Sequence, residues 1–66
     1  MTKIGLIGCG MWGRNLARNL AQLDVLTAVA DKSTQNAAGF AAQFGVEASA
    51  VDDLINNPDI TGIVLA

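Results

Sequence analysis

The stretch Lys3-Ile4-Gly5-Leu6-Ile7-Gly8-Cys9-Gly10-Met11-Trp12-Gly13 combines a short apolar run with three glycines spaced G-x-G-x-x-G. The run over 3–7 is too short for a helix and ends at a glycine, as is typical of a buried parallel strand. From Met11 the apolar residues follow a helical period. The expected stripe consists of Trp12, Leu16, Leu20 and Leu23, and it is widened by Ala17 and Ala21. The glycine motif therefore stands between a strand and a helix.

The remaining sequence alternates in the same way. Apolar runs predict strands over 25–30, 46–48 and 60–66, and helical patterns predict helices over 34–44 and 51–57. Ser33 or Thr34 can cap the longer helix, and Gly45 can end it. The alternation predicts an α/β fold with a partial doubly wound parallel sheet of about four strands and helices on both faces. We expect the first strand to be central, with the second and third on one side and the fourth on the other as an exposed apolar edge.

Each glycine of the motif has a separate physical use. Gly8 permits a tight turn, Gly10 lets a pyrophosphate approach the backbone, and Gly13 lets the helix pack close to the strand. The first helical N–H groups, near Met11 and Trp12, would face the phosphates with the positive end of the helix dipole. The motif in this context predicts a dinucleotide-binding Rossmann domain.

Asp31 supplies the second half of this pattern. It stands 21 residues after Gly10, at the end of the second predicted strand. An acid at this place accepts hydrogen bonds from the adenosine ribose hydroxyls. Its charge would repel a 2′-phosphate, so we expect NAD rather than NADP as the cofactor. The neighbouring Lys32 reduces the expected preference for NAD, because a lysine can form an ion pair with the 2′-phosphate of NADP.

Composition limits the other functions. The net charge is −2, and the four Lys and Arg residues form no patch, which argues against a nucleic-acid partner. The apolar runs are too short for a membrane span or a signal peptide, so we expect no membrane partner. A single cysteine, Cys9, excludes an intrachain disulfide and is consistent with a cytoplasmic location. Histidine is absent, and we expect no metal site and no catalytic residue here.

Some conspicuous residues favour a structural interpretation. Trp12 begins the apolar stripe and is expected to pack, while Cys9 is expected to fill the turn rather than to act as a reactive thiol. Asp52 and Asp53 lie near a helix start, where they complement the dipole. Neighbouring side chains do not share a helix face, so these two acids are not expected to form a catalytic pair.

Three segments of the chain, 3–15, 28–31 and 58–66, closely resemble the amino-terminal part of the Gfo/Idh/MocA oxidoreductases. Gly8, Gly10, Gly13 and Asp31 match the cofactor positions of that family. The tryptophan-glycine-basic-asparagine sequence that ends the loop is similar to members acting on sugars or nucleotide sugars. The resemblance implies that residues 1–66 are the amino-terminal part of a dinucleotide-binding domain, and we expect the catalytic and substrate domain to lie outside them.

The resemblance implies an NAD(P)-dependent dehydrogenase that transfers hydride to or from a sugar, nucleotide sugar or cyclitol. It also implies a second α/β domain and a homo-oligomer. Family members carry a threonine-proline or asparagine-proline loop after the fourth strand and a glutamate-lysine-proline motif with a catalytic lysine. Neither occurs in the 66 residues, so we expect the chain alone to be inactive.

Two alternatives share parts of this pattern. A non-catalytic dinucleotide-sensing regulatory domain would use the same glycines and the same acid, and fold alone does not separate it from an enzyme. A methyltransferase fits less well, because the third glycine and the helix-facing phosphate site suit a pyrophosphate rather than a sulfonium ligand.

Overall fold

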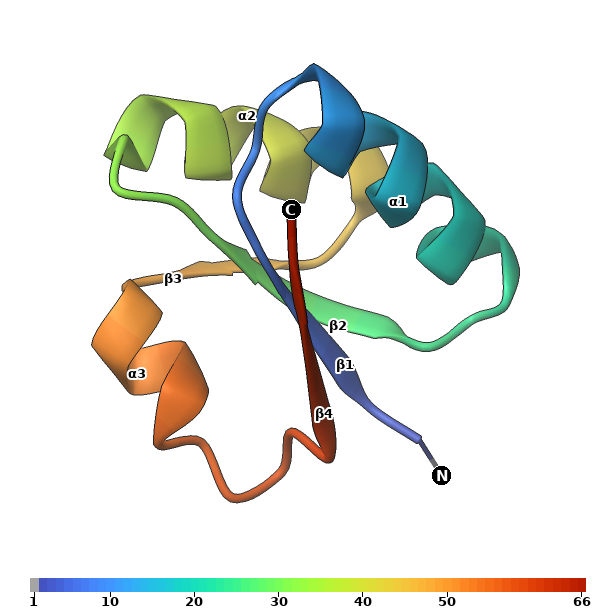
Figure 1. Cartoon of the computed structure of the whole chain (residues 1–66), viewed down its shortest axis with the longest axis vertical. Coiled ribbons are helices and arrows are strands. Elements are labelled where there is room, and N and C mark those ends of the chain that lie inside the picture. Colours follow the sequence, from blue (N-terminus) through green and yellow to red (C-terminus); the bar gives the residue numbers. More distant parts are fainter. Residues whose placement is uncertain (1) are drawn as a thin grey trace.

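The computed structural model describes residues 2–66, which form one parallel sheet of four strands in the order β3-β2-β1-β4 (Figure 1). Along the chain, the elements of these residues are β1 Ile4–Ile7, α1 Met11–Gln22, β2 Leu26–Ala30, α2 Thr34–Phe44, β3 Glu47–Ser49, α3 Val51–Ile55 and β4 Gly62–Leu65. The order is that of a doubly wound sheet. The predicted fold class and the central position of the first strand are therefore confirmed.

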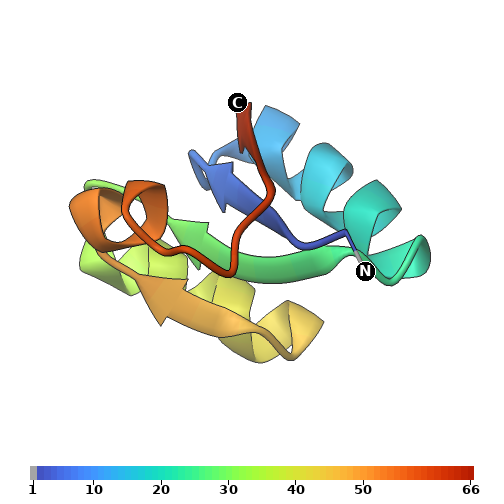
Figure 2. The same cartoon turned by 90° about the horizontal axis from the view of Figure 1, so that it is seen from below.

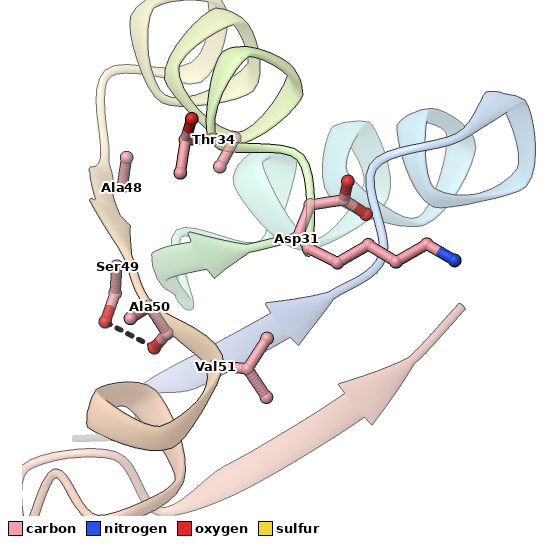
Figure 3. Close-up of a pocket in the computed structure, with 8 residues that line it drawn as sticks. Asp31, Thr34, Ala48, Ser49, Ala50 and Val51 are labelled. Atoms are coloured by element: carbon pink, nitrogen blue, oxygen red, sulfur yellow. Dashed lines mark hydrogen bonds between the residues drawn. The ribbon is translucent and has the colours of Figure 1, made fainter.

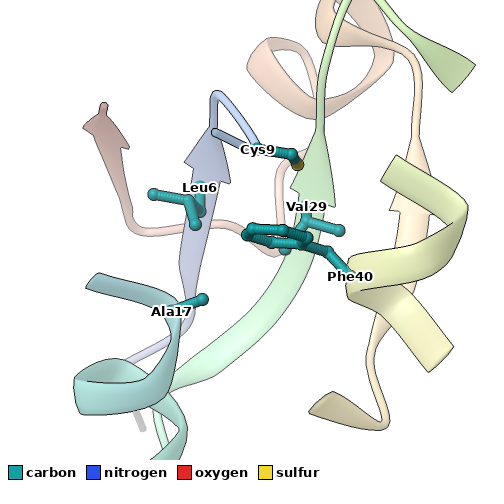
Figure 4. Packing of buried hydrophobic residues seen from close by; sticks show 5 residues of the cluster. All are labelled: Leu6, Cys9, Ala17, Val29 and Phe40. Atoms are coloured by element: carbon teal, nitrogen blue, oxygen red, sulfur yellow. The ribbon is translucent and has the colours of Figure 1, made fainter. Parts of the chain in front are cut away.

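Helices cover both faces of the sheet, as expected. Helices α1 and α2 pack on one face, where the buried cluster consists of Leu6, Cys9, Ala17, Val29 and Phe40 (Figure 4). Helix α3 packs on the other face through Leu54, which contacts Ala28 and Ala30. Successive residues of a strand point to opposite faces, so β2 contributes to both clusters. Figure 2 shows α3 on one side of the strands and α1 on the other.

Local signals fix the ends of α2. The Ser33 side chain accepts a hydrogen bond from the Asn36 N–H at 3.3 Å, so Ser33 rather than Thr34 is the N-cap. Gly45 ends the helix in the left-handed conformation, with φ of 68°. A glycine adopts this conformation without the steric cost that a side chain brings. Both predicted signals are confirmed.

The predicted face of α1 is partly wrong. Ala17 is buried as predicted, but Trp12 and Leu23 are each 70% exposed, and Gly13 is buried instead of Trp12. The apolar stripe alone does not fix which residue of the first turn faces inward. Close packing of Gly13 on the loop before the helix turns this face toward the sheet, and it places Trp12 in solvent. The expectation that Trp12 packs is corrected accordingly.

Several later boundaries differ from the prediction by one or two residues. β3 begins at Glu47 instead of 46, and α3 ends at Ile55 instead of 57. The Ile60 N–H donates to the Asn57 carbonyl at 3.2 Å, so residues 57–60 form a turn and β4 starts only at 62. Ile63 and Leu65 are 40% and 75% exposed, which confirms the apolar edge. None of the helices formed by residues 2–66 has the length and apolar character needed to cross a membrane.

Replacing Gly39 with alanine is expected to stabilise the chain by about 0.5–1 kcal/mol. Gly39 lies inside α2, and a Cβ built there meets nothing within 4 Å. The substitution therefore improves helix propensity without creating a clash. Urea unfolding followed by circular dichroism measures the gain. The matched control is Gly45→Ala, which also meets nothing within 4 Å but places a side chain at a φ of 68°. That variant is expected to lose stability, and a gain in both variants would contradict the prediction.

Candidate dinucleotide-binding site

The site is built on the loop between β1 and α1. Gly8 has a φ of +107°, a conformation that L side chains rarely adopt. The Gly8 N–H donates to the Ala30 carbonyl at 2.9 Å, which ties the loop to the end of β2. A Cβ on Gly8 would also lie 3.0 Å from the Ala66 carbonyl oxygen. The turn predicted for Gly8 is therefore present, and both backbone geometry and space require glycine.

Gly13 is required for a different reason. A Cβ on Gly13 would overlap with the carbonyl oxygen of Gly8, since the first turn of α1 lies directly on the loop. Gly13 is buried, and its conformation is helical. The close approach predicted for the third glycine is present, and it aims the start of α1 at the carboxyl end of β1.

Gly10 has no such structural reason. Its φ of −88° and ψ of −166° are accessible to any residue, and a Cβ there meets nothing within 4 Å. It lines a hollow of about 270 Å³ together with Cys9, Met11 and Arg14. No side chain caps the start of α1, so the hollow opens onto helix N–H groups that lack a capping partner. Such a helix start attracts an anion.

Asp31 follows β2 and holds the loop. One carboxylate oxygen accepts the Cys9 N–H at 3.0 Å, and the other accepts the Ser33 N–H at 2.9 Å. The hydrogen bond from Ser33, followed by that from Cys9, lowers the pKa of Asp31, and the Asn36 side chain and the charge of Lys32 act in the same direction. Desolvation opposes them. The group is therefore a carboxylate at neutral pH, and its remaining lone pairs are available to hydroxyl donors.

A larger hollow of about 450 Å³ lies next to Asp31. It is lined by Asp31, Lys32, Thr34, Ala37, Ala48, Ser49, Ala50 and Val51. Figure 3 shows Thr34 from the start of α2, Asp31 from the loop after β2, and Val51 from the start of α3 around it. Small apolar side chains make up half of the lining, and the charged residues come from the loop after β2. The lining of the hollow therefore combines small apolar side chains with the charged Asp31 and Lys32.

Met11 and Trp12, both expected at the cofactor, lie at the start of α1 with 88% and 70% of their side chains exposed. Their backbones begin the helix at the smaller hollow. Their contact with a cofactor stays a prediction, and the structure leaves two large apolar side chains in solvent beside the loop.

Cys9 fills the turn, as predicted. It is 6% exposed, and its sulfur lies 3.7 Å from the Ala30 carbonyl oxygen. Burial and, to a smaller extent, the charge of Asp31 raise the pKa of the thiol. A thiol with a raised pKa is a poor nucleophile at neutral pH. Within residues 2–66, no group of three or more His, Cys, Asp or Glu residues could hold a metal ion.

Arg14 is not among the residues predicted for the cofactor site. Its guanidinium carbon lies 5.6 Å from the centre of the Phe40 ring, and the residue lines the smaller hollow. Its position directly after the third glycine, in the first turn of the helix, is the signal that could have identified it.

The comparison with protein families decides what kind of site this is. A family model described as an oxidoreductase family with an NAD-binding Rossmann fold matches residues 2–66. The chain belongs to the Gfo/Idh/MocA family. The resemblance noted from the glycine loop, Asp31 and the fourth strand is therefore confirmed for a Gfo/Idh/MocA NAD-binding domain.

Solved structures give the same picture for this Gfo/Idh/MocA chain. A protein of Sinorhizobium meliloti described as a myo-inositol dehydrogenase is 26% identical with a TM-score of 0.93, over 100% of this chain and 21% of the other. UDP-N-acetylglucosamine 3-dehydrogenase from Acidithiobacillus ferrooxidans is 29% identical with a TM-score of 0.86, over 97% and 20%. A levoglucosan dehydrogenase in complex with NADH and L-sorbose is 26% identical with a TM-score of 0.73, over 98% and 21%.

The chain thus spans about one fifth of the length of each of these three structures. No curated protein sequence matches it.

Proposed function

We propose that this chain binds NAD for a Gfo/Idh/MocA dehydrogenase that oxidises or reduces a sugar, nucleotide sugar or cyclitol. The observation that carries the proposal is Gly10. Neither its backbone angles nor its surroundings require glycine, although glycine reduces stability through the entropy of the unfolded chain. A ligand that approaches the backbone at this point accounts for the residue.

The parts of the cofactor fit the described residues one by one. The pyrophosphate would lie against Gly10 and the N–H groups of Met11 and Trp12, at the uncapped start of α1. The adenosine ribose would donate its hydroxyls to Asp31. The adenine would enter the larger hollow, whose apolar lining residues include Ala48 and Val51. Each part thus meets groups of matching chemistry.

The charge of Asp31 supports NAD as the preferred cofactor. The lowered pKa keeps the carboxylate ionised, and a 2′-phosphate on the ribose would add a second anion beside it. Lys32 borders the same hollow and reduces this repulsion without removing it. We therefore expect NAD to bind more tightly than NADP.

The residues of this chain bind and orient the cofactor, and bound NAD supplies hydride exchange at its nicotinamide. Asp31 accepts two N–H groups of the loop, so we assign it to the cofactor and not to proton transfer with the substrate. The substrate classes come from the dehydrogenases that the chain resembles. We expect the 66 residues alone to have no dehydrogenase activity. A homo-oligomer and a cytoplasmic location stay predictions.

Titration with NADH tests the cofactor site. Trp12 is the single tryptophan and stands at the proposed phosphate site, so bound NADH is expected to quench its emission by energy transfer. NADPH should bind more weakly, and S-adenosylmethionine should not bind. Asp31→Asn removes the charge with little change of shape, so it should narrow the difference between NADH and NADPH. An unchanged ratio of the NADH and NADPH affinities would show that Asp31 does not contact the ribose. Absence of NADH binding by the unmodified chain would refute the proposed function.

A further inference from the structure

We propose that the indole of Trp12 contacts the nicotinamide ring of the bound cofactor and binds the oxidised ring more tightly than the reduced one. The inference rests on the dinucleotide binding proposed above, and it gives that site a preference for one oxidation state of its ligand. The backbone N–H of Trp12 is assigned to the phosphates, so its side chain, which is 70% exposed, is free for a separate contact.

The first turn of α1 fixes the direction of the Trp12 side chain. Gly13 is buried, and a Cβ there would overlap with the Gly8 carbonyl oxygen, so this position faces the loop and the sheet. The guanidinium carbon of Arg14 lies 5.6 Å from the centre of the Phe40 ring, which belongs to α2. Successive helical residues are rotated by about 100°, so Arg14 and Trp12 project from opposite flanks of α1. The Trp12 side chain therefore points away from α2.

The flank of α1 that faces away from α2 is the side of β4. Helix α2 packs on β2 and β3, and the strand order β3-β2-β1-β4 places β4 on the other side of β1. A Cβ on Gly13 would lie 3.4 Å from the Ala66 methyl group, so the residue after β4 reaches the first turn of α1 (Figure 2). Trp12 thus projects near the carboxyl ends of β1 and β4. At this point the strand order changes direction, and doubly wound folds bind their ligands there.

The proposed direction of the cofactor brings the nicotinamide to the same region. The adenine and its ribose are assigned to the larger hollow and to Asp31, both at the end of β2, and the pyrophosphate is assigned to the start of α1. A dinucleotide that continues in this direction passes from the β2 side of the glycine loop to the β4 side. Its nicotinamide then lies on the flank from which Trp12 projects.

An indole distinguishes the two forms of nicotinamide by their charge. The oxidised ring is a pyridinium cation, whereas the reduced ring is neutral. Tryptophan gives the strongest cation–π attraction of the aromatic side chains. It also loses little conformational entropy when it becomes ordered, because it has only two rotatable bonds. Both forms of the ring can pack on the indole, but only the oxidised form gains the additional attraction.

Titration calorimetry with NAD⁺, NADH and ADP-ribose tests this assignment, because ADP-ribose lacks the nicotinamide ring. Trp12→Leu is expected to weaken NAD⁺ about two- to fivefold relative to NADH and to leave the affinity for ADP-ribose unchanged. Trp12→Phe should retain part of the preference. The unmodified chain with NAD⁺ should also show the weak charge-transfer absorption of an indole beside a pyridinium, and Trp12→Leu should lack it.

The matched control is Leu23→Ala. Leu23 is as exposed as Trp12 and lies at the other end of α1, so the affinities for all three ligands should stay unchanged. The ratio of the NAD⁺ and NADH affinities separates recognition from folding, because a lower folded fraction weakens both ligands equally and cancels from the ratio.

An unchanged ratio in Trp12→Leu would overturn the assignment, whether the two affinities fall together or stay as they are. If the unmodified chain binds NADH and ADP-ribose but this ratio does not change, the role of Trp12 alone is rejected. If the unmodified chain binds none of the three ligands, the proposed function is wrong as well.

Discussion

Gly13→Ala is expected to reduce the free energy of unfolding by about 1–3 kcal/mol, the usual effect of overpacking a tight contact. The added Cβ would overlap with the Gly8 carbonyl oxygen, which is backbone and cannot rotate away. Helix α1 would have to move off the loop. A chain of this size has a core that rarely supplies more than about 3–5 kcal/mol, so this loss would remove a large part of its stability.

Urea unfolding followed by circular dichroism measures this loss. Gly39→Ala is the matched control, since it adds the same methyl group to a helix where nothing lies within 4 Å. Opposite shifts of the two midpoints would show that the contact with Gly8, and not helix propensity, decides the result. A Gly13→Ala midpoint equal to that of the unmodified chain would refute the tight packing of α1 on the loop.

Gly10→Val is expected to reduce NADH affinity about 100-fold or more, equivalent to the loss of two or more hydrogen bonds. Its backbone angles suit valine, and a Cβ there is free of contacts, so the fold should be retained. The branched side chain would extend into the smaller hollow and keep phosphate oxygens away from the N–H groups at the start of α1. Quenching of Trp12 by NADH measures the affinity, and circular dichroism checks the fold.

Gly10→Ala provides the graded control for this variant. Its single methyl group enters the same space but blocks less of it, so its affinity should fall between those of the unmodified chain and Gly10→Val. Retained affinity in the folded valine variant would show that Gly10 does not face the phosphates, and the proposed site would be wrong. The two Gly10 variants should lose NADH affinity and keep the fold, whereas Gly13→Ala should lose stability. The comparison thus distinguishes a glycine needed for ligand access from one needed for packing.

The strand order could be predicted because alternating strands and helices follow the doubly wound order. The glycine turn and the caps of α2 could be predicted because their signals are local. Ser33 and Gly45 act on the backbone beside them, and Gly8 stands next to the strand that it ends. The position of Asp31 followed from its spacing to the glycines. In these cases a few neighbouring residues contain the information that the structure uses.

Other features depend on contacts between distant residues. The prediction that Trp12 lies on the buried face of α1 was wrong. A helical stripe can rotate by one residue, and the contact of Gly13 with Gly8 determines which face of α1 is buried. The two hydrogen bonds of Asp31 need the loop and β2 to be side by side. Arg14 reaches a ring that stands 26 positions later in the chain, and no local pattern contains that pairing.

The end of β4 rests on the glycine turn. The Ala66 N–H donates to the Ile7 carbonyl at 2.9 Å, and a Cβ added to Gly8 or to Gly13 would lie 3.3 or 3.4 Å from the Ala66 methyl group. The residue that follows β4 thus packs directly against the phosphate loop. The end of this strand and the start of the nucleotide site are therefore in direct contact, so the position of one depends on the position of the other.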